Sequence, residues 1–187
     1  MGQAALRIKM TGEEYLAWEE LQPEKHDFVN GEVYAMAGAE GGHVTTSLNV
    51  AMALRQHLAG SPCRTFIADM KVQAFESASY FYPDVVVTCS DADRASPLIK
   101  REPKLIVEVL SPSTAAYDLG EKFAQYRRIA SLQELAFIDV NSRRCDVYRR
   151  AADGLWLLHP FDAGQAVTLA SVELTINADV LFAEVDE

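Results

Sequence analysis

Long apolar runs are missing from this chain of 187 residues, and none approaches the ~20 residues that a helix needs to cross a bilayer. The chain also lacks a basic start followed by an apolar stretch, so we expect no secretory signal peptide, no membrane partner and a cytoplasmic location. Its three cysteines, Cys63, Cys89 and Cys145, are far apart and form no C-x-x-C pair. This pattern favours free, partly buried thiols over a disulfide framework or a zinc site.

Positive charge is also scarce. The chain has 17 lysine and arginine residues against 27 aspartate and glutamate residues, which gives a net charge of −10. Affinity for DNA usually comes from phosphate neutralisation by basic side chains. An acidic domain must therefore concentrate its positive charge locally, bind through metal ions, or act on another substrate. Three arginine pairs, Arg127-Arg128, Arg143-Arg144 and Arg149-Arg150, are typical of solvated faces rather than of a binding stripe.

The length fits a single domain, residues 1–187, with one sizeable core. No repeats, linkers or low-complexity tracts interrupt it. Helical and strand-like segments are mixed along the chain, which predicts an α/β or α+β fold with a mixed sheet.

Local signals place the elements. Thr11 is the expected N-cap of a short helix with Glu13 and Glu14 in its first turn. Asn30-Gly31 and Asp153-Gly154 each predict a β-hairpin, because these residues tolerate the positive φ angles of a tight turn. The further expected strands cover residues 65–67, 70–74, 82–88, 105–110 and 135–139.

Residues 43–58 predict an amphipathic helix that ends before Gly60. A second helix is expected over residues 118–129, and residues 90–94 are expected to form a polar connector. The apolar face of the first helix is predicted to consist of Val44, Leu48, Ala51, Leu54 and Leu58.

Two carboxylates lie in the most apolar of the expected strands, Asp84 in residues 82–88 and Glu108 in residues 105–110. Charged side chains are rarely buried unless they are paired or bind a metal. Asp84, Glu108 and the backbone carbonyl of Val109 could together hold Mg²⁺ or Mn²⁺ through hard oxygen ligands. Such a metal would activate a water and stabilise charge on a phosphate, as in a metal-dependent phosphodiesterase.

Many metal-dependent nucleases place a lysine two residues after the second carboxylate, but this chain has Leu110 there. Lys122, on the expected helix 118–129, offers a replacement. It shares a helix face with Asp118 and Tyr126, at i, i+4 and i+8. If that helix packs across the sheet, Lys122 can orient the attacking water or stabilise charge on the phosphate.

Each candidate also has a structural interpretation. Asp84 follows Pro83 and could be a turn or strand-entry residue whose carboxylate caps backbone amides. Lys122 could pair with Asp118 on the solvent side of the helix. Glu108, flanked by apolar residues on both sides, is the hardest to explain without a functional role.

The order of these motifs resembles the Uma-type family of bacterial restriction-endonuclease-like proteins, formerly a domain of unknown function. The resemblance covers about residues 11–180. The segments that carry it are Asn30-Gly31-Glu32, His43, Pro83-Asp84-Val85-Val86-Val87, Val107 to Thr114, Asp118, and Lys122 with Tyr126.

This resemblance implies a restriction-endonuclease-like core of the PD-(D/E)xK superfamily, a mixed β-sheet flanked by helices. The two hairpins predicted above would lie at the N-terminal and C-terminal sides of this core. It implies that Asp84 and Glu108 are the metal carboxylates, that Lys122 replaces the motif lysine, and that Glu32 is an additional acidic residue near the site. His43 could contact a phosphate or begin a helix. A homodimer is expected, because such folds often pair their active sites across a two-fold axis.

The leading hypothesis is a Mg²⁺- or Mn²⁺-dependent endonuclease that hydrolyses DNA phosphodiester bonds. A second hypothesis is a catalytically silent dimer with a nuclease fold, acting as a binding or regulatory module. A third is metal-dependent hydrolysis of a smaller phosphate ester, which would avoid the conflict between an acidic chain and DNA.

Overall fold

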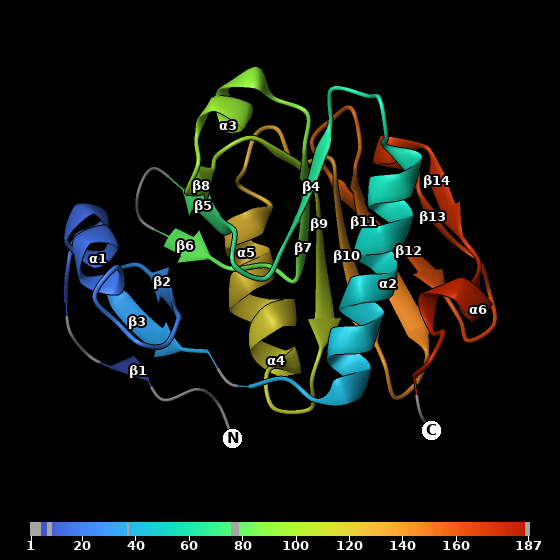
Figure 1. Ribbon diagram of the computed structural model, residues 1–187, viewed down its shortest axis with the longest axis horizontal. Coiled ribbons are helices and arrows are strands. Elements are labelled where there is room, and N and C mark those ends of the chain that lie inside the picture. Colours follow the sequence, from blue (N-terminus) through green and yellow to red (C-terminus); the bar gives the residue numbers. More distant parts are fainter. Residues whose placement is uncertain (1–4, 7–8, 37, 76–78, 186–187) are drawn as a thin grey trace.

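The protein is built around two mixed sheets (Figure 1). The computed structural model describes residues 5–6, 9–36, 38–75 and 79–185, and it contains an α+β fold over these ranges. Each of the two sheets has six strands, and a separate two-stranded ladder lies near the C-terminus. The predicted fold class is confirmed, although the strands form two sheets where the sequence suggested one.

The first sheet has the order β1-β3-β2-β6-β5-β8, with only the β5–β8 pair parallel. The helix α1 (Gly12–Glu19) lies beside it in Figure 1, and its Tyr15 is fully buried against Phe28 of the sheet. The strands are β1 (Ala5–Leu6), β2 (His26–Val29), β3 (Glu32–Ala35), β5 (Lys71–Phe75), β6 (Ser79–Phe81) and β8 (Ile99–Lys100).

Two local predictions in this region are confirmed. Thr11 caps α1 and exchanges hydrogen bonds with Glu14, the reciprocal capping box. Asn30 and Gly31 join β2 to β3 with φ angles of 50° and 94°, the left-handed backbone that a two-residue hairpin requires.

The second sheet has the order β12-β11-β10-β9-β7-β4, in which only β9 and β10 are parallel. The predicted C-terminal hairpin is present as β11 and β12, with Gly154 in the turn at φ 85°. The strands are β4 (Arg64–Ile67), β7 (Val85–Thr88), β9 (Pro103–Leu110), β10 (Glu134–Asp139), β11 (Arg144–Arg150) and β12 (Trp156–Phe161).

Both faces of this second sheet are covered by helices, which explains why its central strands are so apolar. Val85, Val87 and Val107 pack on α2 (Gly41–His57), while Val86 and Ile106 pack on the other face with α5 (Phe123–Tyr126). Figure 1 shows α2 and the α4–α5 region on either side of the strands. Because side chains alternate, Glu108 shares the α5 face with Ile106.

The predicted apolar face of α2 is only partly a core face. Ala51 and Leu54 are buried as expected, and Val50 joins them. Val44 and Leu48, in contrast, are about half exposed, with exposed fractions of 54% and 50%. The prediction was wrong for these two because the buried face of α2 runs through Thr46, Val50 and Leu54. Val44 and Leu48 lie to one side of that face, on the wall of a cavity described below.

The predicted strand 82–88 is broken. Phe81 ends β6 in the first sheet and Val85 begins β7 in the second, so Tyr82, Pro83 and Asp84 form the crossing between the two sheets. Pro83 has no amide hydrogen to donate to a ladder, which favours a break at this point. Asp84 is therefore a strand-entry residue and does not lie within a strand.

The predicted helix 118–129 begins earlier and contains a wider turn. It is formed by α4 (Ala115–Tyr117), the π-helical segment η1 (Asp118–Lys122) and α5, and it ends at Tyr126. The expected connector at residues 90–94 contains the short helix α3 (Asp91–Ala95), capped by Ser90. The remaining elements are β13 (Val167–Leu169), the 3₁₀ turn η2 (Ala170–Val172), β14 (Leu174–Ile176) and α6 (Ala178–Leu181).

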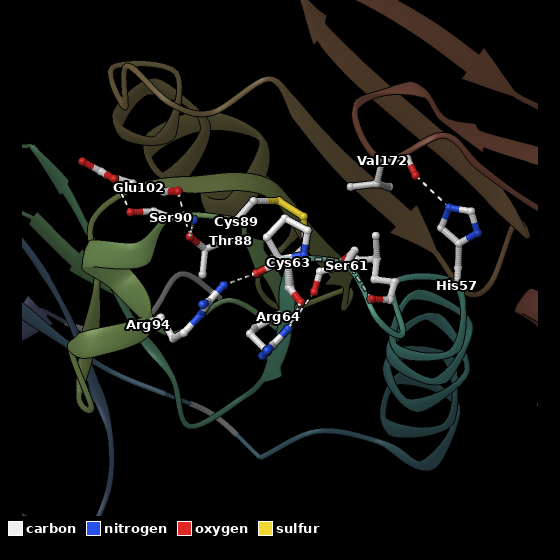
Figure 2. The surroundings of a disulfide bond; sticks show 12 residues. His57, Ser61, Cys63, Arg64, Thr88, Cys89, Ser90, Arg94, Glu102 and Val172 are labelled. Atoms are coloured by element: carbon white, nitrogen blue, oxygen red, sulfur yellow. Dashed lines mark hydrogen bonds between the residues drawn. A yellow bond between two sulfur atoms is a disulfide. The ribbon is translucent and has the colours of Figure 1, made fainter.

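The prediction of free thiols was wrong for two of the three cysteines. Cys63 and Cys89 form a disulfide, shown in Figure 2, whereas Cys145 is a buried free thiol. In the antiparallel β4–β7 pair Arg64 lies opposite Thr88, so the next residue outward on each strand is a cysteine and the two face each other. Their separation of 26 residues in sequence concealed this register.

None of the helices in the described ranges has the length and apolar character needed to span a bilayer.

Candidate active site

Asp84 and Glu108 are brought together by strand register. Val85 of β7 lies opposite Val107 of β9 in an antiparallel pair. One step further along each strand places residue 84 beside residue 108. Two carboxylates that are 24 positions apart in the sequence thus meet at one end of the second sheet, where the chain crosses from the first sheet.

Both carboxylate oxygens of Asp84 have partners. Oδ2 accepts a hydrogen bond of 2.7 Å from the backbone N–H of Val109. The strand β7 begins at Val85, opposite Val107, so it does not extend to the position opposite Val109. Oδ1 lies 2.9 Å from Nε2 of His43, in the first turn of α2. Asp84 therefore caps a backbone amide, as its structural interpretation predicted, while still facing Glu108.

Glu108 is almost completely buried, with 3% of its surface exposed. Its Oε1 accepts a 2.7 Å hydrogen bond from the Tyr126 hydroxyl and lies 3.4 Å from Lys122 Nζ. Burial is the main reason why the pKa of Glu108 rises to about 8, and Asp84 raises it further, while Lys122 lowers it. Among the described residues no hydrogen bond reaches Oε2.

Lys122 lies at the centre of a buried acidic cluster. Its Nζ is 3.3 Å from Asp118, 3.4 Å from Asp27 and 3.4 Å from Glu108. Burial alone would lower the pKa of Lys122, but these carboxylates outweigh it and hold that pKa well above the ordinary value. The surrounding carboxylates thus favour the charged form of Lys122, which lies 3.4 Å from Glu108.

The predicted shared face of Asp118, Lys122 and Tyr126 is confirmed by these contacts. The pair of Asp118 and Lys122 exists, but the alternative that placed it on the solvent side was wrong. Both side chains are buried, with 3% and 7% of their surfaces exposed, because this face of the helical run lies on the sheets.

Asp27 is the member of the cluster that the sequence analysis missed. It lies in β2 with 1% of its surface exposed, and Oδ1 accepts a hydrogen bond of 3.2 Å from the N–H of Tyr82. Burial raises its pKa, and Lys122 counteracts that rise. The available signal was an aspartate just before the apolar pair Phe28-Val29 in an expected hairpin strand, the same anomaly that identified Glu108.

A cavity of about 340 Å³ opens onto these groups. Asp27, Asp84, Glu108, Asp118 and Lys122 line its polar part. Its other walls come from the β3–α2 connection, the first turns of α2, the end of β4 and the turn after β9, and they are mostly apolar or hydroxylated, lined by Met36, Val44, Leu48, Ile67, Ser111 and Thr114. Such a concave site with a few convergent polar groups is the usual form of a ligand or active site.

His43 lies on the cavity wall, and Glu32 does not. Burial would lower the pKa of His43, but its hydrogen bond and charge interaction with Asp84 raise it overall. Its Nδ1 is buried and has no partner among the described residues. Glu32 lies in β3, where it accepts a hydrogen bond of 2.9 Å from the Tyr34 hydroxyl. The described residues that line the cavity do not include it.

Comparisons with known proteins identify relatives of this chain and a structure of similar fold. Residues 12–180 match the Uma2 family model, described as "Putative restriction endonuclease". Two uncharacterized proteins of Synechocystis sp. are similar over most of their length. The protein slr1290 is 39% identical, over 93% of this chain and 92% of its own chain. The protein sll1609 is 38% identical, over 80% of this chain and 85% of its own chain. A crystal structure of "a putative nuclease belonging to DUF820" from Anabaena variabilis superposes with a TM-score of 0.76, covers 93% of this chain and 98% of its own, and is 17% identical. That structure supports the fold.

Proposed function

The chain belongs to the Uma2 family of "Putative restriction endonuclease" proteins, and we propose that it is an endonuclease that hydrolyses DNA phosphodiester bonds with Mg²⁺ or Mn²⁺ in the cytoplasm. The observation that carries the proposal is the meeting of Asp84 and Glu108 beside Lys122 on the wall of a cavity. Restriction-endonuclease-like families generally use divalent metals, and this arrangement of two carboxylates and one ammonium group suits that chemistry.

The donor atoms fit a hard divalent ion. Glu108 lines the cavity, and its Oε2 has no hydrogen-bond partner among the described residues. Asp84 and Val109 line the same cavity and could supply a carboxylate and a carbonyl oxygen. No group of three histidine, cysteine, aspartate or glutamate side chains in the described ranges forms a ready-made cage. Mg²⁺ does not need one, since it commonly keeps several waters and uses one or two carboxylates. When bound there, the ion would lower the pKa of a water and stabilise charge on the phosphate.

Lys122 would act as a fixed positive charge. A lysine whose pKa is held high cannot serve as a general base near neutral pH. Its ammonium can instead orient a water by hydrogen bonding or stabilise the charge that develops on a phosphate oxygen. The carboxylates of Asp27 and Asp118 keep Nζ in place for either task.

His43 would be a positioning residue. Its contact with Asp84 Oδ1 fixes one carboxylate oxygen, while the N–H of Val109 fixes the other. This arrangement orients Asp84 toward Glu108, as hydrogen-bonded neighbours of metal-binding carboxylates commonly do. The role of Glu32, which the family resemblance implies, stays a prediction.

The test is nicking of supercoiled plasmid DNA in Mg²⁺ or Mn²⁺. Glu108→Gln should abolish nicking, because the amide keeps the shape of the side chain but is a poor ligand for a hard cation. Glu121→Gln is the matched control, an exposed carboxylate one residue before Lys122 that bonds Gln125. Glu32→Gln should nick less well only if the family-implied role holds. Equal nicking by wild type and Glu108→Gln would refute the proposal.

A second candidate, a catalytically silent dimer that serves as a binding or regulatory module, is favoured by one surface feature. Val44, Leu48, Met52 and Ile67 are each at least half exposed on neighbouring parts of α2 and β4, an edge strand. Apolar groups gathered in this way often mark a protein interface. Sedimentation of wild type and Met52→Glu tests the dimer. A wild-type protein that is dimeric but does not nick plasmid DNA would favour this second function.

A further inference from the structure

Although the net charge of this protein is −10, several of its arginines gather on one part of its surface. In the described part of the chain, Arg94, Arg144 and Arg149 each form an ion pair with a carboxylate. Four other arginines, which lie around the end of α5, form no ion pair with any of the described residues. Three of them touch aromatic rings, and the fourth, Arg101, donates a hydrogen bond to Gln73. We name these arginines and rings the arginine–aromatic surface: Arg101, Arg127, Arg128, Arg150, Phe75, Phe123 and Trp156.

Three of the guanidinium groups lie over aromatic rings. Arg128 is 3.4 Å from the ring centre of Phe75, Arg150 is 4.9 Å from that of Trp156, and Arg127 is 5.9 Å from that of Phe123. These contacts hold the cations in place without neutralising them, because the ring attracts the charge through its quadrupole.

Arg150 also fixes the position of its neighbours. Its guanidinium donates hydrogen bonds of 2.6 Å to the carbonyl of Arg127 and 2.8 Å to that of Ile129. These are carbonyls at the C-terminal end of the helical run, where a cation is favourable. The turn that presents Arg127 and Arg128 to solvent is thereby anchored to β11, and both arginines remain exposed.

Two adjoining depressions cross this surface and share Arg128. One, of about 250 Å³, is lined by Phe75, Arg101 and Arg128 together with Ile129 and Ala130 of the turn after α5. The other, of about 540 Å³, is lined by Arg127, Arg128, Tyr148 and Trp156. No aspartate or glutamate lines either depression within the described residues. In a chain of net charge −10, this is a local concentration of positive charge.

We propose that the arginine–aromatic surface binds a single-stranded nucleic acid, with phosphates on the arginines and bases against the half-buried rings. Guanidinium groups match phosphate geometry, and aromatic rings stack bases of any sequence. The helical run ends at Tyr126, four residues after Lys122, and Arg127 and Arg128 follow it directly. The surface therefore begins roughly 6 Å along the helix from Lys122. The inference rests on the proposed function only for the choice of nucleic acid as ligand.

The experiment is fluorescence anisotropy of a labelled 20-nucleotide strand with the full chain, in EDTA and low salt. Wild type should bind, and the double variant Arg127→Gln/Arg128→Gln should bind roughly tenfold more weakly. The slope of log affinity against log salt should fall by about 1.4, because each lost contact on a single strand contributes about 0.7. Arg143→Gln/Arg144→Gln is the matched control, an adjacent pair elsewhere on the surface with the same change in charge.

Two further measurements distinguish a single-stranded nucleic acid from other anionic ligands of the arginine–aromatic surface. Trp156→Leu should weaken binding at least about fivefold, while Trp156→Phe, which keeps a ring, should not. Polyglutamate should compete poorly. The inference is overturned if the two arginine pairs have equal effects, if a duplex binds as tightly as the strand, or if polyglutamate competes as well as DNA. Binding is measured without metal, so Glu108→Gln should bind normally even if it cannot nick.

Discussion

Replacing Glu108 by glutamine tests the electrostatics of the candidate site without relying on catalysis. Glutamine keeps the size of the side chain and an oxygen that can accept the hydrogen bond from Tyr126. It removes only the carboxylate, which the fold buries beside Asp84 and Asp118. The variant therefore isolates the free energy of ionising one carboxyl group in this position.

The sign of the effect follows from the shifted pKa. Burial raises the pKa of Glu108 from 4.5 to about 8, so between these pH values the native state holds a proton that the unfolded state has released. Stability from this group is present at low pH and is lost as the pH rises through that interval. At 1.36 kcal/mol per pKa unit, the wild-type loss by pH 8 is up to about 5 kcal/mol.

Glu108→Gln should therefore match wild type near pH 4.5 and exceed its free energy of unfolding by several kcal/mol at pH 8. The assay is urea unfolding followed by tryptophan fluorescence, in EDTA, at both pH values. Glu121→Gln, on the same helical run but exposed, should show no such pH-dependent gain. A difference between wild type and Glu108→Gln that is the same at both pH values would refute the reasoning.

Adding Mg²⁺ extends the test to the proposed metal site. A ligand that binds only the native state at 100 times its Kd stabilises it by about 2.7 kcal/mol. Wild type at pH 8 should gain stability on titration with Mg²⁺, whereas Glu108→Gln should gain much less. The difference in free energy of unfolding between Glu108→Gln and wild type at pH 8 would then become smaller. An equal response of both proteins would place the metal elsewhere or exclude its binding.

Three further changes have expected outcomes. Lys122→Met should lower the free energy of unfolding by roughly 3–5 kcal/mol in chemical denaturation, because it leaves buried carboxylates without their cation. Cys63→Ser with Cys89→Ser, or a reductant on wild type, should lower it by about 3 kcal/mol, given the separation of 26 residues, and an unchanged stability would argue against the disulfide. Gly31→Ala should cost about 1 kcal/mol or more in thermal unfolding because of the φ of 94°, while Gly38→Ala, with open space around it, should cost less.

Features that depend on a few neighbouring residues could be predicted from the sequence. The capping box of Thr11 and Glu14 and the hairpin at Asn30-Gly31 are fixed by local hydrogen bonds and local backbone preferences. The orientation of Glu108 was also accessible. Alternation along a strand puts it on the face opposite Val107 and Val109, whichever helix covers that face.

Features that depend on how strands and sheets meet could not be predicted in this way. Asp27 becomes part of the site only because Tyr82, 55 positions later, crosses beside it and donates an amide hydrogen. The pairing of Cys63 with Cys89 needs the register of β4 on β7. The exposure of Val44 depends on which face of α2 the second sheet covers. Periodicity along one segment contains none of this information.

The net negative charge of the chain, which argued against a nuclease, is matched by an excess of carboxylates at the candidate site. Asp27, Glu108 and Asp118 surround a single cation, Lys122, so full ionisation would leave an excess of two negative charges in a buried cluster. Low dielectric makes such an excess costly. Burial is the main cause of the raised pKa of Glu108, and the neighbouring carboxylates Asp84 and Asp118 raise it further. A proton can relieve it, and so can a divalent cation bound through the same carboxylate. The two must then compete, so the affinity of this site for Mg²⁺ should increase with pH up to about 8. On this reasoning the negative charge around Lys122 favours metal binding, and the affinity for nucleic acid must come from surfaces elsewhere on the protein.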